Sequence, residues 1–314
     1  MPGPFCRRCA EPVSVLDQFC ERCGADVAAV PRDRVEVDLG VAAGVSDRGW
    51  RYARNEDALA LRDVNPGRDV NSGREAVVAV VCDGVSSSSR SGEASETAAE
   101  VAAESLVVAL RAKGSPIAAT RAAIHAADRA VSGLADSAGA SPVRSCRGAP
   151  ACTFVSAIVS GTEVTVGWVG DSRAYWIPQG HTGLRSARLT DDDSWLTQVL
   201  SDGTMSPAQA AADRRAHAIT AWLGEDADRI DPHVVTIEPQ GPGVVVVCTD
   251  GLWNYLDTVD ELAAALPPQA LDAPLDAART LVEIALNSGG QDNITVAVVP
   301  FGSHPNGSQP GHWP

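Results

Sequence analysis

The chain has 314 residues, of which 45% are hydrophobic, and a formal net charge of −15. A chain of this length can bury a full core, so one large domain with a small appendage is expected. The acidity argues against a nucleic-acid surface and against an anionic membrane, because both require clustered Lys and Arg. No stretch approaches the roughly 18 consecutive apolar residues of a membrane span, and residues 1–33 lack signal-peptide architecture. The sequence therefore predicts a cytoplasmic protein.

Four cysteines near the N-terminus form two C-x-x-C pairs, Cys6 with Cys9 and Cys20 with Cys23. Two such pairs can place four thiolates tetrahedrally around Zn²⁺ in a closed structural site. Disulfides or a redox C-x-x-C are the alternative, but the pairs have no secretion signal and no strand–helix context. We expect residues 1–27 to form a zinc ribbon, resembling the small ribbons at protein termini whose usual role is docking. Because a segment this short cannot build a hydrophobic core, the bound metal would supply its folding free energy.

The main domain is expected to span residues 38–301, after a linker at 28–37 and before a disordered polar tail at 302–314. Its first strand is expected at 39–46 and its second at 58–62.

Acidic residues stand at the ends of the most apolar strands. Two runs of mostly β-branched residues end at Asp83 and Asp250, and Asp292 opens a third run. Short continuous apolar runs are typical of strands buried on both faces. Packing of each strand would therefore fix the position of the carboxylate at its end, at the edge of the hydrophobic core. Gly84 follows the first acid and allows either an unusual backbone angle or a close approach, and Asp250-Gly251 repeats this pattern at the second strand. Acids placed in this way can converge on one hard cation.

The remaining elements fall into two groups. Helices are expected at 92–112, 115–135, in two short pieces up to 212, at 258–266 and at 274–286, and strands at 152–160, 163–169, 174–178, 232–238, 243–249 and 294–299. Strands in two clusters with helices after each predict an α+β fold with two sheets and outer helices. A tight turn at 170–173 presents a further carboxylate, that of Asp171.

Seven short motifs occur in one order, each at an expected strand or helix end. They are 55–57 (NED), 83–84 (DG), 170–173 (GDSR), 189–194 (LTDDDS), 220–224 (TAWLG), 249–252 (TDGL) and 290–293 (GQDN). This order resembles the metal-dependent PP2C-type (PPM) Ser/Thr protein phosphatase family over about residues 38–300. A single motif is weak, and their order makes the resemblance specific. The resemblance implies an αββα sandwich, in which two central antiparallel β-sheets are flanked by helices.

The resemblance also implies a binuclear Mn²⁺ or Mg²⁺ centre that hydrolyses phosphoserine and phosphothreonine through direct attack of a metal-bound water. Carried over to this chain, Asp83 would bridge both ions and the Gly84 carbonyl would ligate one of them. Asp250 and Asp292 would complete the other.

In the same carry-over, Glu56 and Asp57 would hold metal-bound waters, and Asp171 would belong to a third, weaker metal site. The residue chemistry agrees, because all-oxygen ligands favour Mg²⁺ or Mn²⁺ over zinc. Two close ions would lower the pKa of a bridging water and hold the phosphoryl oxygens for in-line attack. No phosphoenzyme is needed, so Cys82 and Cys248 are expected to be buried small hydrophobes.

The chain departs from the family pattern at substrate and flap positions. Residues 85–89 (VSSSS) follow the DG where a Gly-rich stretch is common, and no His stands beside it as general acid. Tyr52 occupies the usual place of the phosphate-binding Arg, which leaves Arg51, one residue away, as the candidate. Asp193 and Ala221 replace a common His and a common Arg. All the core metal carboxylates remain, which favours an active enzyme.

The sequence thus predicts a Ser/Thr protein phosphatase with Asp83, Asp250, Asp292 and Arg51 as catalytic residues. Its substrates would be phosphoproteins, it would oppose a Ser/Thr kinase, and the ribbon would dock a kinase, a substrate or a scaffold. Two alternatives stay open. One is a phosphatase-like adaptor that binds phosphoproteins without turnover. The other is a sporulation-type phosphatase of the same fold with one dedicated regulatory substrate.

Overall fold

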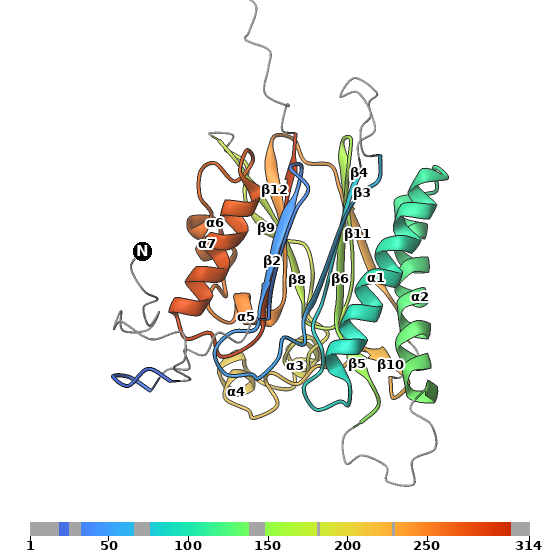
Figure 1. Cartoon of the computed structure of the whole chain (residues 1–314). Helices are drawn as coiled ribbons and strands as arrows, with labels where there is room; N and C mark the ends of the chain where they lie inside the picture. The colour runs from blue at the N-terminus through green and yellow to red at the C-terminus, as the bar shows by residue number, and fades with distance from the viewer. Residues whose placement is uncertain are drawn as a thin grey trace, which may run out of the picture.

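Two antiparallel β-sheets lie face to face, with a layer of helices on each outer side (Figure 1). The computed structural model describes residues 19–24, 33–65, 76–137, 148–180, 183–227 and 230–302. This architecture confirms the predicted α+β sandwich. Cys6, Cys9 and the predicted tail from residue 303 lie outside the described residues. Within the described ranges, no helix combines the length and apolarity that crossing a membrane requires.

The first sheet has six strands in the order β1-β2-β13-β12-β8-β9. They are β1 (Arg34–Asp38), β2 (Ala43–Asp47), β8 (Arg173–Pro178), β9 (Ala187–Arg188), β12 (Gly243–Cys248) and β13 (Ile294–Phe301). Helices α5 (Asp250–Trp253), α6 (Val259–Ala265) and α7 (Pro274–Asn287) pack on its outer face. The central strands β12 and β13 pair with each other and are buried along their whole length.

The second sheet has five strands in the order β11-β7-β6-β4-β3. They are β3 (Ala58–Asp63), β4 (Ala76–Cys82), β6 (Phe154–Ser160), β7 (Glu163–Val169) and β11 (His233–Ile237), and a separate short pair joins β5 (Ala151–Cys152) to β10 (Leu223–Gly224). Helices α1 (Ser91–Arg111) and α2 (Pro116–Ser137) cover its outer face. Along α1, Ala94, Ala98 and Ala102 recur at helical spacing and are fully buried, so this small-residue stripe lets α1 lie close to the sheet.

The continuous apolar run in β12 follows from its position between two hydrophobic layers. Successive side chains of a strand point to opposite faces. Val244 and Val246 therefore pack toward the helices, whereas Val245 and Val247 pack between the two sheets. Such a strand has no face that water contacts, which explains why its sequence shows no polar alternation.

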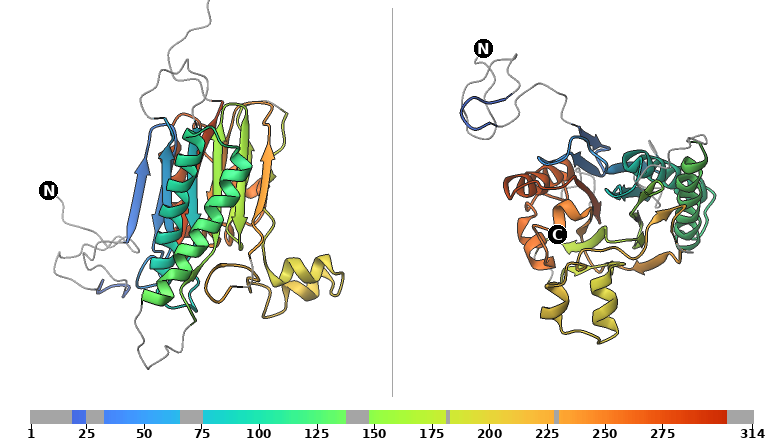
Figure 2. Two further views of the ribbon diagram at one scale, coloured as in Figure 1. Left: turned by 90° about the vertical axis from the view of Figure 1, so that its right-hand side faces the viewer. Right: turned by 90° about the horizontal axis from the view of Figure 1, so that it is seen from below.

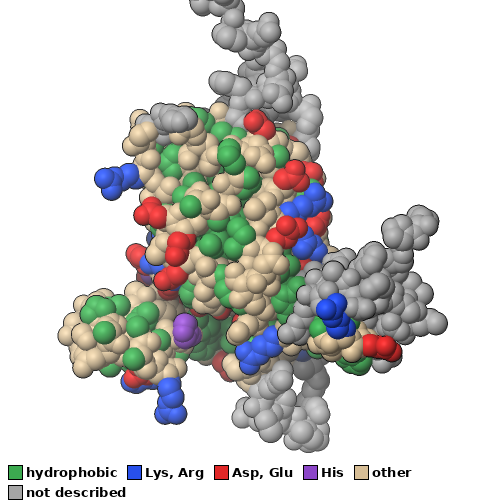
Figure 3. All heavy atoms as spheres, turned by 90° about the vertical axis from the view of Figure 1, so that its left-hand side faces the viewer, with side chains coloured by type: hydrophobic (Ala, Val, Ile, Leu, Met, Phe, Trp, Pro, Cys, Tyr) green, Lys and Arg blue, Asp and Glu red, His purple; other side chains and the backbone are tan. Residues whose placement is uncertain are grey.

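Two short helices form a flap that projects from one end of the sandwich (Figure 2). They are α3 (Trp195–Ser201) and α4 (Pro207–Ala211). Ser194 caps α3 by accepting a hydrogen bond from the Thr197 backbone N–H, and Ser206 caps α4 in the same way. The two short helices expected before residue 212 are confirmed. None of the α3 side chains is buried, and hydrophobic side chains gather on the lower-left lobe of Figure 3, which is the flap.

The start of the main domain differs from the expectation. Residues 34–37 were expected to be linker, but together with Asp38 they form β1, which pairs antiparallel with β2. The expected strand at 39–46 begins only at Ala43, because residues 39–42 make the turn between the two strands. Gly40 has a left-handed φ of 75°, and its N–H donates to Asp38 Oδ1 at 2.8 Å. This Asx-type turn reverses the chain.

Candidate metal centre

Carboxylates from both sheets meet at the end of the sandwich where the flap lies. Asp57 precedes β3, Asp83 follows β4, Asp171 follows β7, Asp250 follows β12 and Asp292 precedes β13. Neighbouring antiparallel strands run in opposite directions, so the start of one and the end of the next share a sheet edge. All these carboxylates therefore lie at the lower end of the sandwich in Figure 1, where α5 begins.

The electrostatics of Asp83 show that these groups interact. Burial raises the pKa of Asp83 well above its usual value, and the charges of Asp57, Asp250, Asp171 and Asp292 raise it further. Burial raises the pKa of Asp250 too, and the neighbouring Asp83 side chain opposes that rise. The structure thus brings together every carboxylate that the sequence placed at a strand end.

The pKa values of three other acids in the cluster are also raised. Burial is the largest cause in each, raising the pKa of Asp57 to about 8, of Asp171 to about 7 and of Asp292 to about 6. The charge of Asp250 adds to all three shifts. Burial and neighbouring like charges favour the protonated carboxyl groups, and a bound cation would favour the ionised ones.

The donor set fits a divalent cation. Within the described residues, Asp57 Oδ1 and Asp250 Oδ1 are buried carboxylate oxygens that accept no hydrogen bond. A buried oxygen without a partner is costly unless it meets a cation, and carboxylate oxygens are the ligands that Mg²⁺ and Mn²⁺ prefer. No three Asp, Glu, His or Cys side chains in the described ranges already form a coordination shell.

Two glycines allow the acidic segments to approach each other. A Cβ on Gly84 would lie 2.7 Å from the Glu56 carbonyl oxygen, and one on Gly251 would lie 1.9 Å from the Asn293 carbonyl oxygen. Neither glycine has a positive φ. Of the two roles considered from the sequence, close approach is therefore the one that the structure shows. Any side chain at Gly251 would push α5, and Asp250 with it, away from β13.

Asn293 holds the segment that carries Glu56. Its Oδ1 accepts a hydrogen bond from the Glu56 backbone N–H at 2.7 Å. Its Nδ2 donates to the carbonyl oxygens of Arg48 at 2.8 Å and Arg54 at 3.1 Å. One side chain thus fastens residues 48–56 to the start of β13. The sequence contains Asn293 in a motif, but nothing in the sequence alone shows which backbone groups it binds.

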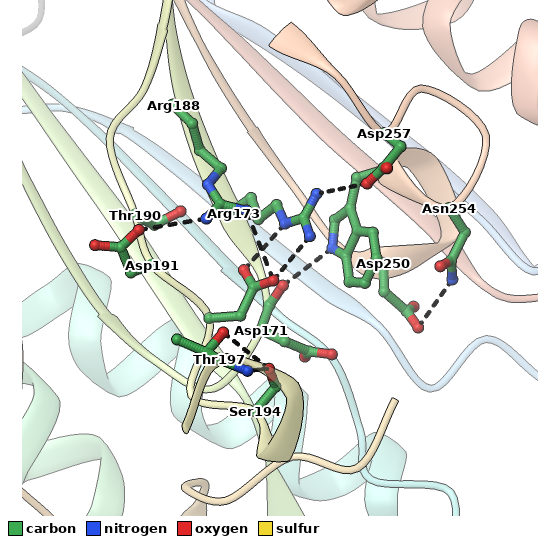
Figure 4. Close-up of polar contacts among 12 residues, drawn as sticks. Asp171, Arg173, Arg188, Thr190, Asp191, Ser194, Thr197, Asp250, Asn254 and Asp257 are labelled. Carbon is green, nitrogen blue, oxygen red and sulfur yellow. Dashed lines mark hydrogen bonds and ion pairs between the residues drawn. The ribbon is translucent and has the colours of Figure 1, made fainter. Parts of the chain in front are cut away.

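Asp171 is supported by a buried arginine (Figure 4). Arg173 donates to both carboxylate oxygens of Asp192, at 3.0 and 2.7 Å, and lies 3.7 Å above the Trp253 ring. The indole N–H of Trp253 donates to the Asp171 carbonyl oxygen at 3.0 Å. This network orients the turn that presents Asp171 toward Asp250. In the sequence, Arg173 appears only as part of the GDSR motif.

Asp193, which stands where the family often has a His, contacts a His from another strand. Its Oδ2 accepts from the Gly170 backbone N–H at 2.9 Å, and its Oδ1 lies 2.9 Å from His233 Nε2. The His233 ring stacks on Trp168 with centroids 4.9 Å apart. The carboxylate therefore joins the base of the flap to β11 and to the turn before Asp171.

Arg51 and Glu56 also lie at the cluster. The charge of Arg51 opposes the rise in the pKa of Asp292, whereas the charge of Glu56 adds to it. The Arg51 guanidinium lies 5.8 Å from the centre of the Tyr52 ring and is exposed. An exposed arginine beside a cation site is well placed to meet a phosphate.

Cys82 and Cys248 are fully buried, as predicted. Burial raises the pKa of both thiols. A buried neutral thiol is a poor nucleophile, so neither side chain is suited to form a covalent intermediate.

A groove approaches the cluster from the side of β1 and α1. It encloses about 720 Å³ and is lined by residues 33–35, by residues 54–59 and by the first turns of α1. Side chains of both charges line it, including Arg54, Glu56, Glu93 and Glu96. The groove gives an extended chain room beside the acidic residues.

The fold and the site together define a class of protein, a two-sheet sandwich that gathers carboxylates for a divalent cation at one end. The family profile of protein phosphatase 2C matches residues 53–273. The chain belongs to the protein phosphatase 2C family.

Individual relatives agree with this placement. The serine/threonine phosphatase stp of Listeria monocytogenes is 34% identical over 155 residues, which cover 47% of this chain and 55% of the relative. The serine/threonine protein phosphatase PstP of Mycobacterium tuberculosis is 26% identical over 147 residues, which cover 46% of this chain and 26% of the relative. The chain thus spans only about a quarter to a half of these relatives' length.

A solved structure has the same fold. The catalytic domain of the phosphatase PstP in complex with two manganese ions superposes with a TM-score of 0.58 at 23% identity, covering 85% of this chain and 99% of that one.

Proposed function

We propose that this chain is a metal-dependent Ser/Thr protein phosphatase that hydrolyses phosphoserine and phosphothreonine. The observation that carries the proposal is the meeting of buried carboxylates from both sheets, two of which have an oxygen without a hydrogen-bond partner in the described residues. Membership of the protein phosphatase 2C family and the manganese bound by the PstP domain support the same reaction.

In this proposal, Asp83, Asp250, Asp292 and the Gly84 carbonyl hold two Mn²⁺ or Mg²⁺ ions, and Asp171 belongs to a third site. Bound ions of this kind activate water and neutralise charge that develops on a phosphoryl group.

The other residues of the site bind the phosphate and orient water around the cations. Arg51 donates to the phosphate oxygens as an exposed guanidinium. Glu56 and Asp57 orient the water that surrounds the cations, and Asn293 fixes the segment that carries them. The groove beside α1 has room for the phosphoprotein chain next to the acidic residues.

The substrates we propose are cytoplasmic phosphoproteins made by a Ser/Thr kinase that this phosphatase opposes. Phosphate release from phosphothreonine, phosphoserine and phosphotyrosine peptides, measured with Mn²⁺ or with EDTA, tests the proposal. We expect Mn²⁺-dependent release from the first two peptides. Binding of these peptides by metal-loaded protein without any release would contradict the proposal and favour the phosphatase-like adaptor. Release from one regulatory phosphoprotein alone would favour the dedicated sporulation-type enzyme.

We also propose that Cys6, Cys9, Cys20 and Cys23 hold one structural Zn²⁺, and that this ribbon docks a protein partner. The support is the spacing of the two C-x-x-C pairs together with the turn at the second pair. There the Gly24 N–H donates to the Cys20 carbonyl oxygen at 2.8 Å, and Gly24 has a φ of 69°. A left-handed glycine makes such a tight turn possible.

Zinc content and a deletion test the ribbon. We expect one zinc per chain by elemental analysis and a loss of that zinc in Cys20→Ser. Deleting residues 1–30 should leave hydrolysis of a small aryl phosphate intact, because the ribbon precedes the phosphatase domain in the chain. It should weaken capture of the partner. Loss of small-substrate turnover on deletion would show instead that the ribbon supports the fold.

A further inference from the structure

Asp57 is held through one of its two carboxylate oxygens only. Thr295 Oγ1 donates to Asp57 Oδ2 at 2.8 Å, and Thr249 Oγ1 donates to the same oxygen at 2.9 Å. Asp57 Oδ1 is buried and has no hydrogen-bond partner in the part of the chain that the structure describes. Both threonines are fully buried. The two hydroxyls therefore fix the carboxylate and leave the other oxygen open.

The direction of each hydrogen bond follows from the number of protons available. A hydroxyl has one proton, and Thr295 uses its own on Asp57, so it must accept from Ser46 Oγ at 2.7 Å. Ser46 in turn accepts from Asn55 Nδ2 at 2.7 Å. Asn55 Oδ1 accepts from the Asp57 backbone N–H at 3.2 Å, which closes the ring.

Thr249 is oriented by the strand that carries Thr295. Its Oγ1 accepts the Thr295 backbone N–H at 3.0 Å, so its only proton points to Asp57. The Thr249 N–H donates back to the Thr295 carbonyl oxygen at 3.1 Å. Thr295 is the one hydroxyl side chain of the otherwise apolar strand β13. A hydroxyl so deep in an apolar strand is costly unless it has partners, and both of its partners belong to this ring.

We propose that Thr249 and Thr295 are positioning residues, whose hydroxyls hold Asp57 by Oδ2 so that Oδ1 faces the divalent-cation site. The ring of Asn55, Ser46, Thr295 and Asp57 joins β2 and β13 of one sheet to the start of β3 in the other. The position of Asp57 in the acidic cluster therefore depends on how far apart the two sheets lie. The inference rests on the proposed function in one respect only, that the cluster binds a divalent cation.

The test replaces a hydroxyl by a methyl group of the same shape. Thr295→Val and Thr249→Val should each weaken Mn²⁺ binding by about 10–100-fold, the usual effect of losing a hydrogen bond that supports a metal site from outside its ligand shell. Thr295→Ser keeps the hydroxyl and should restore most of the affinity. Mn²⁺ dissociation constants of the full chain are measured by isothermal titration calorimetry, and melting temperatures are measured in EDTA.

Thr165→Val is the matched control. Thr165 is buried in β7, and its hydroxyl bonds the Thr236 hydroxyl at 2.8 Å, away from the acidic cluster. This change should lower the melting temperature without changing Mn²⁺ affinity. If Thr295→Val and Thr249→Val behaved like Thr165→Val, the threonines would be structural only and the inference would be wrong.

The outcomes separate the inference from the proposed function. Phosphate release by the wild-type chain tests the proposed function. The ratio of variant to wild-type Mn²⁺ dissociation constants tests whether the threonines position Asp57. If Thr295→Val does not fold, Thr249→Val and the Ser variant still give that ratio. A wild-type chain that bound no Mn²⁺ would reject the cation site itself.

Discussion

Arg173 shows how a single residue organises the region around Asp171. Its side chain is 7% exposed, it pairs with both oxygens of Asp192, and it stacks on Trp253, which bonds the Asp171 carbonyl. Removing one partner of a buried ion pair leaves the other charge without compensation. The residue is therefore needed for stability and, through Trp253, for the position of Asp171.

Arg173→Ala should destabilise the protein by up to about 3–5 kcal/mol, because Asp192 would stay largely buried and keep only its longer ion pair with Arg188, at 3.7 Å. The free energy of unfolding, measured with urea, checks this. Arg62→Ala is the control, since Arg62 and its partner Glu100 are 37% and 50% exposed. Its effect should stay within about 1 kcal/mol. Equal effects of the two changes would contradict the role of Arg173.

Contacts between elements determine where the carboxylates lie. The start of α5 contacts the start of β13 through Gly251. The turn at Gly49 contacts the segment just before β13, where a Cβ on Gly49 would lie 2.0 Å from the Asp292 carbonyl oxygen. Asp250 and Asp292 each lie beside such a contact. Close backbone packing at these two glycines therefore contributes to the placement of Asp250 and Asp292.

Gly251→Ala should destabilise the protein by about 1–3 kcal/mol, the usual cost of overpacking, and should weaken Mn²⁺ binding. Gly133→Ala, in α2, is the control, because a Cβ there would meet nothing within 4 Å. It should stabilise the protein by about 0.5–1 kcal/mol. Thermal melting and Mn²⁺ titration measure both effects. Unchanged Mn²⁺ affinity in Gly251→Ala would show that this contact does not position Asp250.

The sequence predicts those elements whose signal is local. Apolar runs closed by Asp83 and Asp250 identify buried strands, since a strand covered on both faces must be apolar throughout. Strand β1 has only two valines among charged residues, and its pairing with β2 decides its conformation. The hydroxyl of Thr295 binds a carboxylate 238 residues away. Which strands become neighbours is a property of the assembled sheets, so this contact could not be predicted.

At the scale of the whole molecule, the sandwich concentrates negative charge at one end. The pKa values of Asp57, Asp171 and Asp292 are raised to about 8, 7 and 6, chiefly by burial. A carboxyl group with a raised pKa binds more protons in the folded state than in the unfolded state. Its contribution to stability is therefore present at low pH and is lost as pH rises through the folded-state pKa.

The metal-free protein should accordingly become less stable as pH rises from about 5 to about 8, whereas stabilisation by Mn²⁺ should increase over the same range. Melting temperatures in EDTA and in Mn²⁺, compared across this range, measure both trends. Asp83→Asn should make both trends with pH less steep, because Asp83 interacts with the carboxyl groups of Asp57, Asp171, Asp250 and Asp292. A Mn²⁺-induced shift that is constant with pH would contradict the proposed charge cluster.

The central claim is that cations held by the strand-end carboxylates carry out the hydrolysis. Phosphate release from a phosphothreonine peptide, compared between wild type and Asp250→Asn with Mn²⁺, tests it most directly. We expect kcat/KM to fall by at least about 100-fold, because several kcal/mol of charge stabilisation are lost. The exposed control Asp260→Asn should keep wild-type activity. Equal Mn²⁺-dependent turnover in Asp250→Asn and wild type would contradict the claim.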